Sequence, residues 1–209
     1  MPILRTLLTN LALVAAGGTA LCAATDGFHA FTTETARRIE VRQHPVPLPA
    51  ATLETQSGNR IRFTDFRGTW LLVDFIYTRC PTYCRALGGE FAQLQRRLAG
   101  PIAQGQVRLL SISFDPVHDT PQQLAAYQQR FRDQGFGWIA ARPVDTDELR
   151  QLERVFGITV IADRFGGFTH NAAVHVVDPQ GRLVAILDMG SPELVASSLP
   201  QNFAQNIDP

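Results

Sequence analysis

The chain has 209 residues, 45% hydrophobic and 18% charged, so it is long and apolar enough for one folded domain with an appended segment. Its 19 acidic and 19 basic residues balance. This leaves no basic excess for a phosphate backbone, so we do not expect nucleic acid as a partner. All 19 basic residues are arginine, which excludes lysine-dependent chemistry such as Schiff-base formation or P-loop phosphate binding. Three cysteines are too few for a disulfide-dense scaffold.

Residues 1–24 have the pattern of a signal peptide or an N-terminal membrane anchor. Arg5 supplies a short positive region, and the stretch from Leu7 to Ala24 is uncharged, mostly apolar and just long enough to cross a bilayer as a helix. Cys22 also suggests lipidation, although the bulky Leu21 precedes it. Cleavage, lipidation and retention as an anchor all stay open. In each case we expect the protein on the periplasmic side of the cytoplasmic membrane, anchored or soluble.

The rest of the chain divides by composition. Residues 25–50 are polar and rich in proline, which is typical of a tether. Residues 51–200 carry regular strand and helix patterns and form the predicted domain. Residues 201–209 form a polar C-terminal tail.

Strands and helices alternate along the predicted domain. Short strands at 53–55 and 61–63 flank a turn, which predicts a β-hairpin, and continuous apolar runs predict buried strands at 70–77 and 107–114. The other predicted elements are a helix from Cys84 to Leu98, a helix capped by Thr120 and Pro121, a strand at Trp138–Ala141, a helix from Asp145 to Phe156, a hairpin of Ala172–Val177 with Leu183–Leu187, and a helix from Ser191.

This order predicts an α/β domain with a central mixed β-sheet, helices on both faces and an N-terminal β-hairpin extension. A thioredoxin-like layout fits it best. In that layout the loop from the first long strand into its helix lies at the carboxyl end of a parallel strand and at a helix N-terminus. Cys80 and Cys84 lie in this loop.

The cysteine pair at this loop is suited to sulfur chemistry. Cys80 and Cys84 are one helical turn apart, so their sulfurs can converge on one metal ion or close a disulfide. The helix N-terminus and Arg79 both favour thiolates. A disulfide closing so short a loop would stabilise the fold little, which favours a functional role for the pair. The spacing alone leaves copper, zinc and dithiol redox chemistry open.

Two segments together resemble the Sco/SenC family. They are residues 74–84, DFIYTRCPTYC, and residues 111–121, SISFDPVHDTP, and the resemblance extends over about residues 53–187. It implies a thioredoxin-like, membrane-tethered copper chaperone, a metallochaperone more than an enzyme. Such a protein helps to assemble the copper centre in subunit II of cytochrome c oxidase, so the implied partners are that subunit and, as further candidates, other copper chaperones.

The resemblance also implies a ligand set. In the family, the two motif cysteines and one distant histidine bind copper, and here they correspond to Cys80, Cys84 and His170. Two soft thiolates select Cu(I), and an imidazole also suits Cu(II), so the cargo is copper in either or both states. A structural zinc site would usually need a fourth protein ligand. No catalytic residue or organic cofactor is implied.

Residues around the expected site receive weaker interpretations. By alternation His175 belongs to a strand interior and is expected to pack. His118 is expected to be an exposed loop residue, with an approach to the site from a neighbouring loop as the alternative. Asp115 and Asp119 match acidic family positions, and we expect them to order the metal loop, to offer a docking surface, or to serve turns and helix caps. Three residues depart from the family pattern, so copper affinity or release is expected to differ: Tyr83, Thr169 and Asn171.

The alternative is a thiol–disulfide oxidoreductase that reduces cysteines of the oxidase copper site, with Cys80 and Cys84 as the exchanging pair. Ordinary thioredoxins space these cysteines as CxxC and place a cis-proline beside them. The corresponding stretch here, residues 166–171, contains no proline and carries His170 instead. A peroxidase lacks its motif here, and a purely structural domain leaves the cysteine pair without a purpose.

Overall fold

The computed structural model describes residues 2–25, 27, 32–79, 83–131, 136–164 and 167–200; at positions 2, 4 and 83–87 it describes the backbone alone. The chain forms two compact units, Met1–His44 and Pro45–Pro209.

The first unit contains two helices, α1 (Pro2–Ala24) and α2 (Thr33–Gln43). Within α1, residues Arg5–Ala24 have a mean hydropathy of 1.7, which suffices by length and composition to cross a membrane, a test that signal sequences also pass. Helix α2 lies inside the stretch expected to be a tether. The Thr32 hydroxyl caps its N-terminus by accepting from Thr35 N, and Glu34 pairs with Arg38 one turn later at 3.0 Å.

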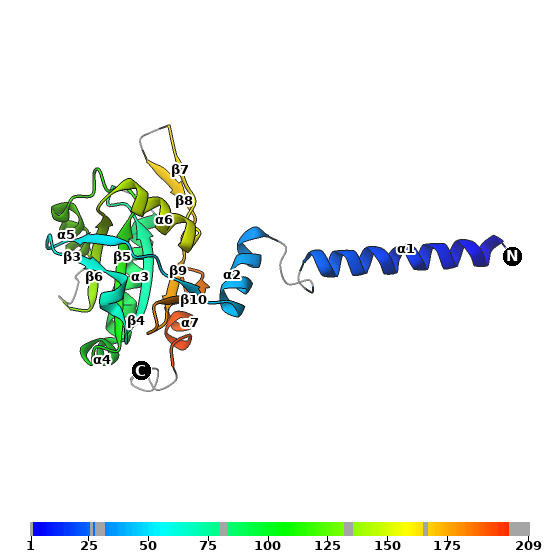
Figure 1. Ribbon diagram of the computed structural model, residues 1–209, viewed down its shortest axis with the longest axis horizontal. Helices are drawn as coiled ribbons and strands as arrows, with labels where there is room; N and C mark the ends of the chain where they lie inside the picture. Colours follow the sequence, from blue (N-terminus) through cyan, green and yellow to red (C-terminus); the bar gives the residue numbers. More distant parts are fainter. Residues whose placement is uncertain are drawn as a thin grey trace. The chain divides into compact units, whose positions relative to one another are not determined.

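The second unit is built on a mixed sheet with the order β1-β10-β9-β4-β5-β6-β2-β3 (Figure 1). Its strands are β1 (Val46–Pro47), β2 (Thr52–Thr55), β3 (Arg60–Arg62), β4 (Trp70–Ile76), β5 (Val107–Ser113), β6 (Trp138–Pro143), β9 (Val174–Val177) and β10 (Arg182–Leu187). The neighbours β4–β5 and β5–β6 run parallel, and every other pair is antiparallel. Because β1 pairs with β10, the expected tether also contributes an edge strand.

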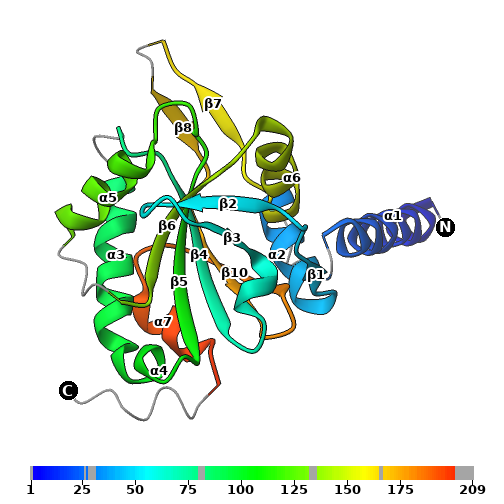
Figure 2. The same ribbon diagram turned by 60° about the vertical axis from the view of Figure 1, so that its left-hand side comes forward.

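Helices cover both faces of this sheet, as expected. They are α3 (Tyr83–Arg97), α4 (Ala99–Ala103), α5 (Pro121–Arg130), α6 (Thr146–Phe156) and α7 (Pro192–Ser197), with a 3₁₀ turn η1 (Phe63–Phe66). Figure 2 shows α3, α5 and α7 gathered to one side of the sheet and α6 on the other. The predicted hairpins, buried strands and capped helices are confirmed, with α3 beginning one residue earlier than expected.

Alternation along β4 assigns its side chains to the two faces. Phe75 points to the α6 face, where its ring lies 5.2 Å from that of Phe156. On the α3 face, Phe91 of α3 contacts Trp138 of β6, with ring centroids 5.9 Å apart. Both faces of β4 are therefore buried, which explains why its sequence is a continuous apolar run broken by Asp74.

A separate two-stranded sheet, β7 (Val160–Ala162) with β8 (Phe168–His170), was not predicted from the sequence. In Figures 1 and 2 it projects beyond the end of the main sheet. His170 is the last residue of β8 and pairs in register with Val160. His170 therefore lies at the base of this hairpin and precedes β9 in the chain.

Candidate metal centre

The expected metal loop lies where two parallel strands end. Ile76 of β4 is paired with Ser113 of β5, so the residues that follow each strand meet at one edge of the sheet. Helix α3 starts there with Tyr83 and Cys84, in agreement with the predicted strand–loop–helix position. Cys80 lies outside the described residues, and Cys84 is described by its backbone, as the second residue of α3.

Asp119 holds the segment before Cys80 against the loop after β5. Its side chain is completely buried. One carboxylate oxygen accepts from Thr78 N at 2.9 Å and from Ser113 Oγ at 2.6 Å, and the other accepts from Thr78 Oγ1 at 2.6 Å. Thr120, the next residue, caps α5. Asp119 therefore orders the segment around Thr78, one of the roles expected for it, and Thr120 caps the helix.

Asp115 joins Arg79 and His118. Its two oxygens lie 2.8 Å from Arg79 Nη2 and 2.7 Å from His118 Nδ1. Burial acts to raise the pKa of Asp115, but the hydrogen bonds from His118 and Arg79 and the charges of both outweigh it, so the pKa lies below its usual value. The charge of Arg79, expected to favour thiolates, is thus partly neutralised by Asp115.

His170 lies in an aromatic environment at the same edge. Its ring centroid is 4.8 Å from that of Phe114, the residue directly after β5. Tyr77 and Phe168 extend this cluster, since their rings lie 5.3 Å apart and the Tyr77 hydroxyl is 3.3 Å from Phe168 N. The residue after β4, the residue after β5 and strand β8 are therefore brought together around one imidazole.

The tautomer of His170 follows from its contacts. Nδ1 lies 3.2 Å from the carbonyl oxygen of Asn171, which can only accept, so Nδ1 carries the proton. Nε2 is buried, and no described residue bonds to it. Burial lowers the pKa of His170 in spite of the hydrogen bond to Asn171, which favours the charged form. The imidazole is therefore neutral near pH 7, with an unshared lone pair at Nε2.

These properties fit a metal ligand. A ligating imidazole must be neutral, and it usually donates its other N–H to a carbonyl or carboxylate. Among the residues whose side chains are described, no three His, Cys, Asp or Glu side chains form a metal-binding group. His170 is thus the one member of the expected ligand set whose side chain the structure describes.

The structure describes the side chains of two residues that depart from the family pattern, Asn171 and Thr169. Asn171 ties the base of the β7–β8 hairpin to the end of α6, because its Oδ1 accepts from Thr159 N at 2.7 Å and its Nδ2 donates to Gly157 O at 2.8 Å. Thr169 is an exposed residue of β8. Asn171 therefore positions the segment that carries His170.

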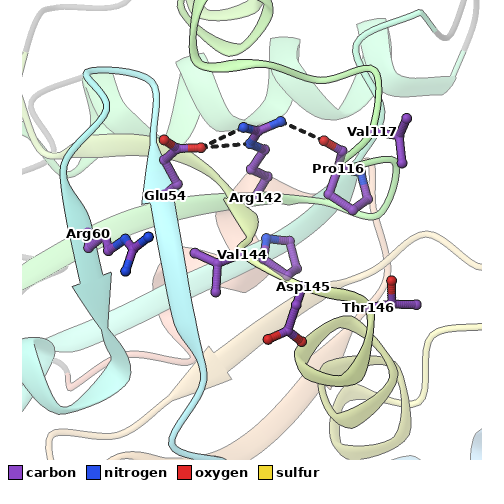
Figure 3. Close-up of a pocket in the computed structure, with 9 residues that line it drawn as sticks. Glu54, Arg60, Pro116, Val117, Arg142, Val144, Asp145 and Thr146 are labelled. Carbon is purple, nitrogen blue, oxygen red and sulfur yellow. Dashed lines mark hydrogen bonds and ion pairs between the residues drawn. The ribbon is translucent and has the colours of Figure 1, made fainter.

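A pocket of about 360 Å³ is lined by Pro116 and Val117 of the loop after β5 and, across from them, by Glu54, Arg60 and Arg142 (Figure 3). There Arg142 of β6 donates to Pro116 O at 2.6 Å, and its Nε and Nη2 donate to Glu54 of β2 at 2.9 and 2.7 Å. This contact was not predicted from the sequence, because Glu54 and Arg142 are 88 positions apart and no local pattern signals their pairing.

The fold and the position of the cysteine motif define the fold class of this protein. A parallel β–α–β unit followed by an antiparallel hairpin and a helix, with a cysteine in the first turn of α3, is the thioredoxin-like arrangement. Within that class, the family model SCO1/SenC matches residues 49–201. The chain belongs to the SCO1/SenC family.

Known proteins agree with this assignment. A putative copper-binding protein of Stutzerimonas stutzeri is 26% identical over 187 residues, covering 88% of each chain. Three solved structures share the fold. A SCO1/SenC family lipoprotein of Bacillus anthracis has a TM-score of 0.65 and 20% identity, with 79% of this chain and 99% of that chain covered. Copper-bound ScoI of Bradyrhizobium japonicum has a TM-score of 0.61 and 23% identity, with 73% of this chain and 97% of that chain covered. BsSco, described as a Sco-family cytochrome c oxidase assembly protein with a disulfide switch, has a TM-score of 0.65 and 21% identity, with 79% of this chain and 96% of that chain covered.

Proposed function

We propose that this protein is an extracytoplasmic copper chaperone that holds copper through Cys80, Cys84 and His170 and delivers it to subunit II of cytochrome c oxidase. The observation that carries the proposal is His170, a half-buried neutral imidazole whose buried Nε2 is bonded by no described residue. Its position at the edge where the cysteine loop departs supports a shared site. Copper binding and oxidase assembly are also what the descriptions of related proteins state.

The thiols and the imidazole of the proposed site have different roles. The two thiols lose their protons when copper binds, and the resulting thiolates favour Cu(I). His170 needs no deprotonation, because its Nδ1 keeps a proton bonded to Asn171 O, and its imidazole extends the site to Cu(II). Asp119 holds Thr78, two residues before Cys80, so the described segment that leads into the cysteine motif is fixed at the carboxyl edge of the parallel strands.

The N-terminal segment supports the proposed location. An apolar helix of this length, followed by the folded unit, favours export and a position near the periplasmic face of the membrane, with α1 cleaved, lipidated or retained. A relative described as a lipoprotein supports membrane attachment. The proposed partners are the oxidase subunit that receives copper and a second copper chaperone that supplies it.

A second candidate function is thiol–disulfide exchange by Cys80 and Cys84 on the same oxidase subunit. It is favoured by a relative whose structure is described as containing a disulfide switch. The two functions use the same sulfurs and differ in their need for His170, because dithiol exchange requires two sulfurs and no imidazole.

The decisive experiment compares His170→Ala with Cys80→Ala, using the exposed His44→Ala as the matched histidine control. Reduced protein is loaded anaerobically with Cu(I) and separately with Cu(II), and metal affinity and the disulfide reduction potential are measured. We expect His170→Ala to weaken Cu(II) binding by roughly 10–100-fold or more, since even an outer partner of a metal ligand costs that much. Its disulfide should still open and close, whereas Cys80→Ala should lose both properties.

Oxidase copper content in cells then separates the two functions. A chaperone predicts oxidase without copper in both the His170→Ala and Cys80→Ala strains. Normal oxidase assembly with His170→Ala, but none with Cys80→Ala, would reject the chaperone and favour the reductase.

A further inference from the structure

His118 is a second imidazole at the edge of the sheet that carries the proposed copper site. Its side chain is 53% exposed, whereas Asp115, which orients it, is 7% exposed. The ring of His170 lies on Phe114 and the ring of His118 is bonded to Asp115. Phe114 and Asp115, consecutive residues of one loop, therefore contact both imidazoles, the half-buried His170 and the exposed His118.

The contacts of His118 match those of a metal-binding histidine. The 2.7 Å contact of Nδ1 with a buried carboxylate oxygen, which can only accept, places a proton on Nδ1, so Nε2 is the nitrogen available to a metal when it carries no proton. The same carboxylate binds Arg79, the residue directly before Cys80, and Arg79 Nη2 is 3.2 Å from His118 Nδ1. His118 is thereby held beside the segment that leads into the cysteine motif.

The position of His118 is fixed from both sides of the loop. On one side, buried Asp119 binds Thr78 and Ser113. On the other side, Arg142 donates to Pro116 O and is itself held by Glu54, as Figure 3 shows. The turn does not need the imidazole, because its backbone bond runs from His118 N to Asp115 O at 3.1 Å whatever the side chain.

We propose that His118 is a transient copper ligand at the rim of the site, which takes the ion from a donor and passes it inward to the thiolates and His170. This inference rests on the proposed chaperone function. The step is a ligand exchange without change of oxidation state: a donor–copper bond breaks as the bond from His118 Nε2 forms, and that bond breaks as a thiolate of Cys80 or Cys84 takes the ion. The carboxylate of Asp115 balances part of the charge during the passage.

The test measures the rates of copper transfer as well as the equilibrium affinity. Reduced full-length protein is mixed rapidly with a Cu(I)–chelator complex, and loading and release are followed for wild type, His118→Ala and His118→Asn. Asparagine keeps a donor where Nδ1 was, and so preserves the bond to Asp115, but has no Nε2. We expect both variants to load and release copper roughly tenfold more slowly, the lower end of the usual cost of losing a group at a metal site, with equal affinity.

Val117→Ala is the matched control, since Val117 is the preceding residue and is 81% exposed, and its rates should equal those of wild type. Wild-type rates of copper loading and release in His118→Asn would overturn the inference. If His118→Ala is slow while His118→Asn has wild-type rates, His118 is only a structural partner of Asp115. The two failures are distinguishable: full copper binding by Cys80→Ala and His170→Ala would reject the chaperone function, whereas normal rates in His118→Asn would reject the rim ligand alone.

Discussion

His170 and His175 are five residues apart, His175 buried and His170 half-buried, and their chemistry differs. Both nitrogens of His175 face carbonyl oxygens, Val73 O at 3.3 Å and Phe156 O at 3.1 Å, and its ring packs edge-on against Phe75 and Phe156. In His170, Nδ1 is hydrogen-bonded to the carbonyl oxygen of Asn171, and no described residue bonds to Nε2. His175 therefore stabilises the core, whereas His170 keeps a lone pair for a ligand.

Asp119 gives the first prediction at the scale of a single residue. In Asp119→Asn the amide has one acceptor oxygen in place of two, so at least one of the three donors from Thr78 and Ser113 stays unbonded in a buried site. Each such donor costs about 1–3 kcal/mol. We expect urea unfolding to show a free energy of unfolding lower by about that amount.

Asp145→Asn is the control for this prediction. Asp145 caps α6 through Glu148 N, and asparagine is as good an N-cap as aspartate, so its stability should stay close to that of wild type. Equal stability of Asp119→Asn and Asp145→Asn would show that Asp119 does not hold the loop.

How far the sequence predicts the site differs from residue to residue. The paired cysteines indicate sulfur chemistry by their spacing alone, whereas His170 follows from the family resemblance, because a single histidine before a strand carries no periodic signal. The bonds from Asp115 to Arg79 and from Glu54 to Arg142 join segments that are 36 and 88 positions apart. Such long-range pairs depend on the tertiary fold and leave no local pattern.

At the scale of elements, β4 carries an acidic residue in an apolar run. Asp74 is fully buried on the face covered by α3. No described donor lies within hydrogen-bonding geometry of either of its carboxyl oxygens. Burial raises the pKa of Asp74 to about 8; the Ser111 hydroxyl opposes this rise, and the negative charge of Glu90 on α3 adds to it. Strand β4 therefore holds a protonated carboxyl at pH 7.

The second prediction is a pH dependence of stability that originates in β4. Between the unfolded pKa of about 4 and the folded pKa of about 8, the native state keeps a proton on Asp74 that the unfolded chain has released. The free energy of unfolding therefore falls as pH rises through this window, by at most about 1.4 kcal/mol per pH unit, and this contribution is constant above it. Asp74→Asn removes the titration, so its stability should gain on that of wild type from pH 5 to 8.

Chemical denaturation at several pH values checks this expectation. Asp147→Asn is the matched control, because the Asp147 side chain is 80% exposed and its loss should leave the pH slope unchanged. A pH slope in Asp74→Asn equal to that of wild type would contradict a protonated carboxyl in β4.

The elements that the sequence did not predict are short or polar. The strands β7 and β8 have three residues each and pair chiefly with one another, so neither is long enough to show alternation. Helix α2 has a polar composition that is typical of a tether, and prolines follow it closely, so a helix was not predicted there. Its helical signals are the capping threonine Thr32 and the Glu34–Arg38 pair. The long buried strands and amphipathic helices, by contrast, were predictable because burial dictates their period.

At the scale of the whole molecule, the copper-binding proposal places all its chemistry in the second unit. The carboxyl edge of the parallel strands, the start of α3 and the β7–β8 hairpin all belong to Pro45–Pro209. The apolar helix α1 belongs to the first unit, and the residues of its apolar window are not buried. Location and metal binding are therefore expected to be separable functions of the chain.

The last prediction tests this separation by removing residues 1–24. Because the second unit has its own core, the shortened protein should be soluble, bind copper with wild-type affinity and keep a free energy of unfolding within about 0.5 kcal/mol of the full chain, the range typical of changes away from a core. In cells, full-length protein should fractionate with the membrane or the periplasm, whereas the shortened chain, lacking the apolar helix, should remain in the cytosol. Recovery of the full-length protein from the cytosol with its cysteines reduced would contradict the proposed export, and loss of copper binding in the purified shortened protein would contradict a metal site confined to the second unit.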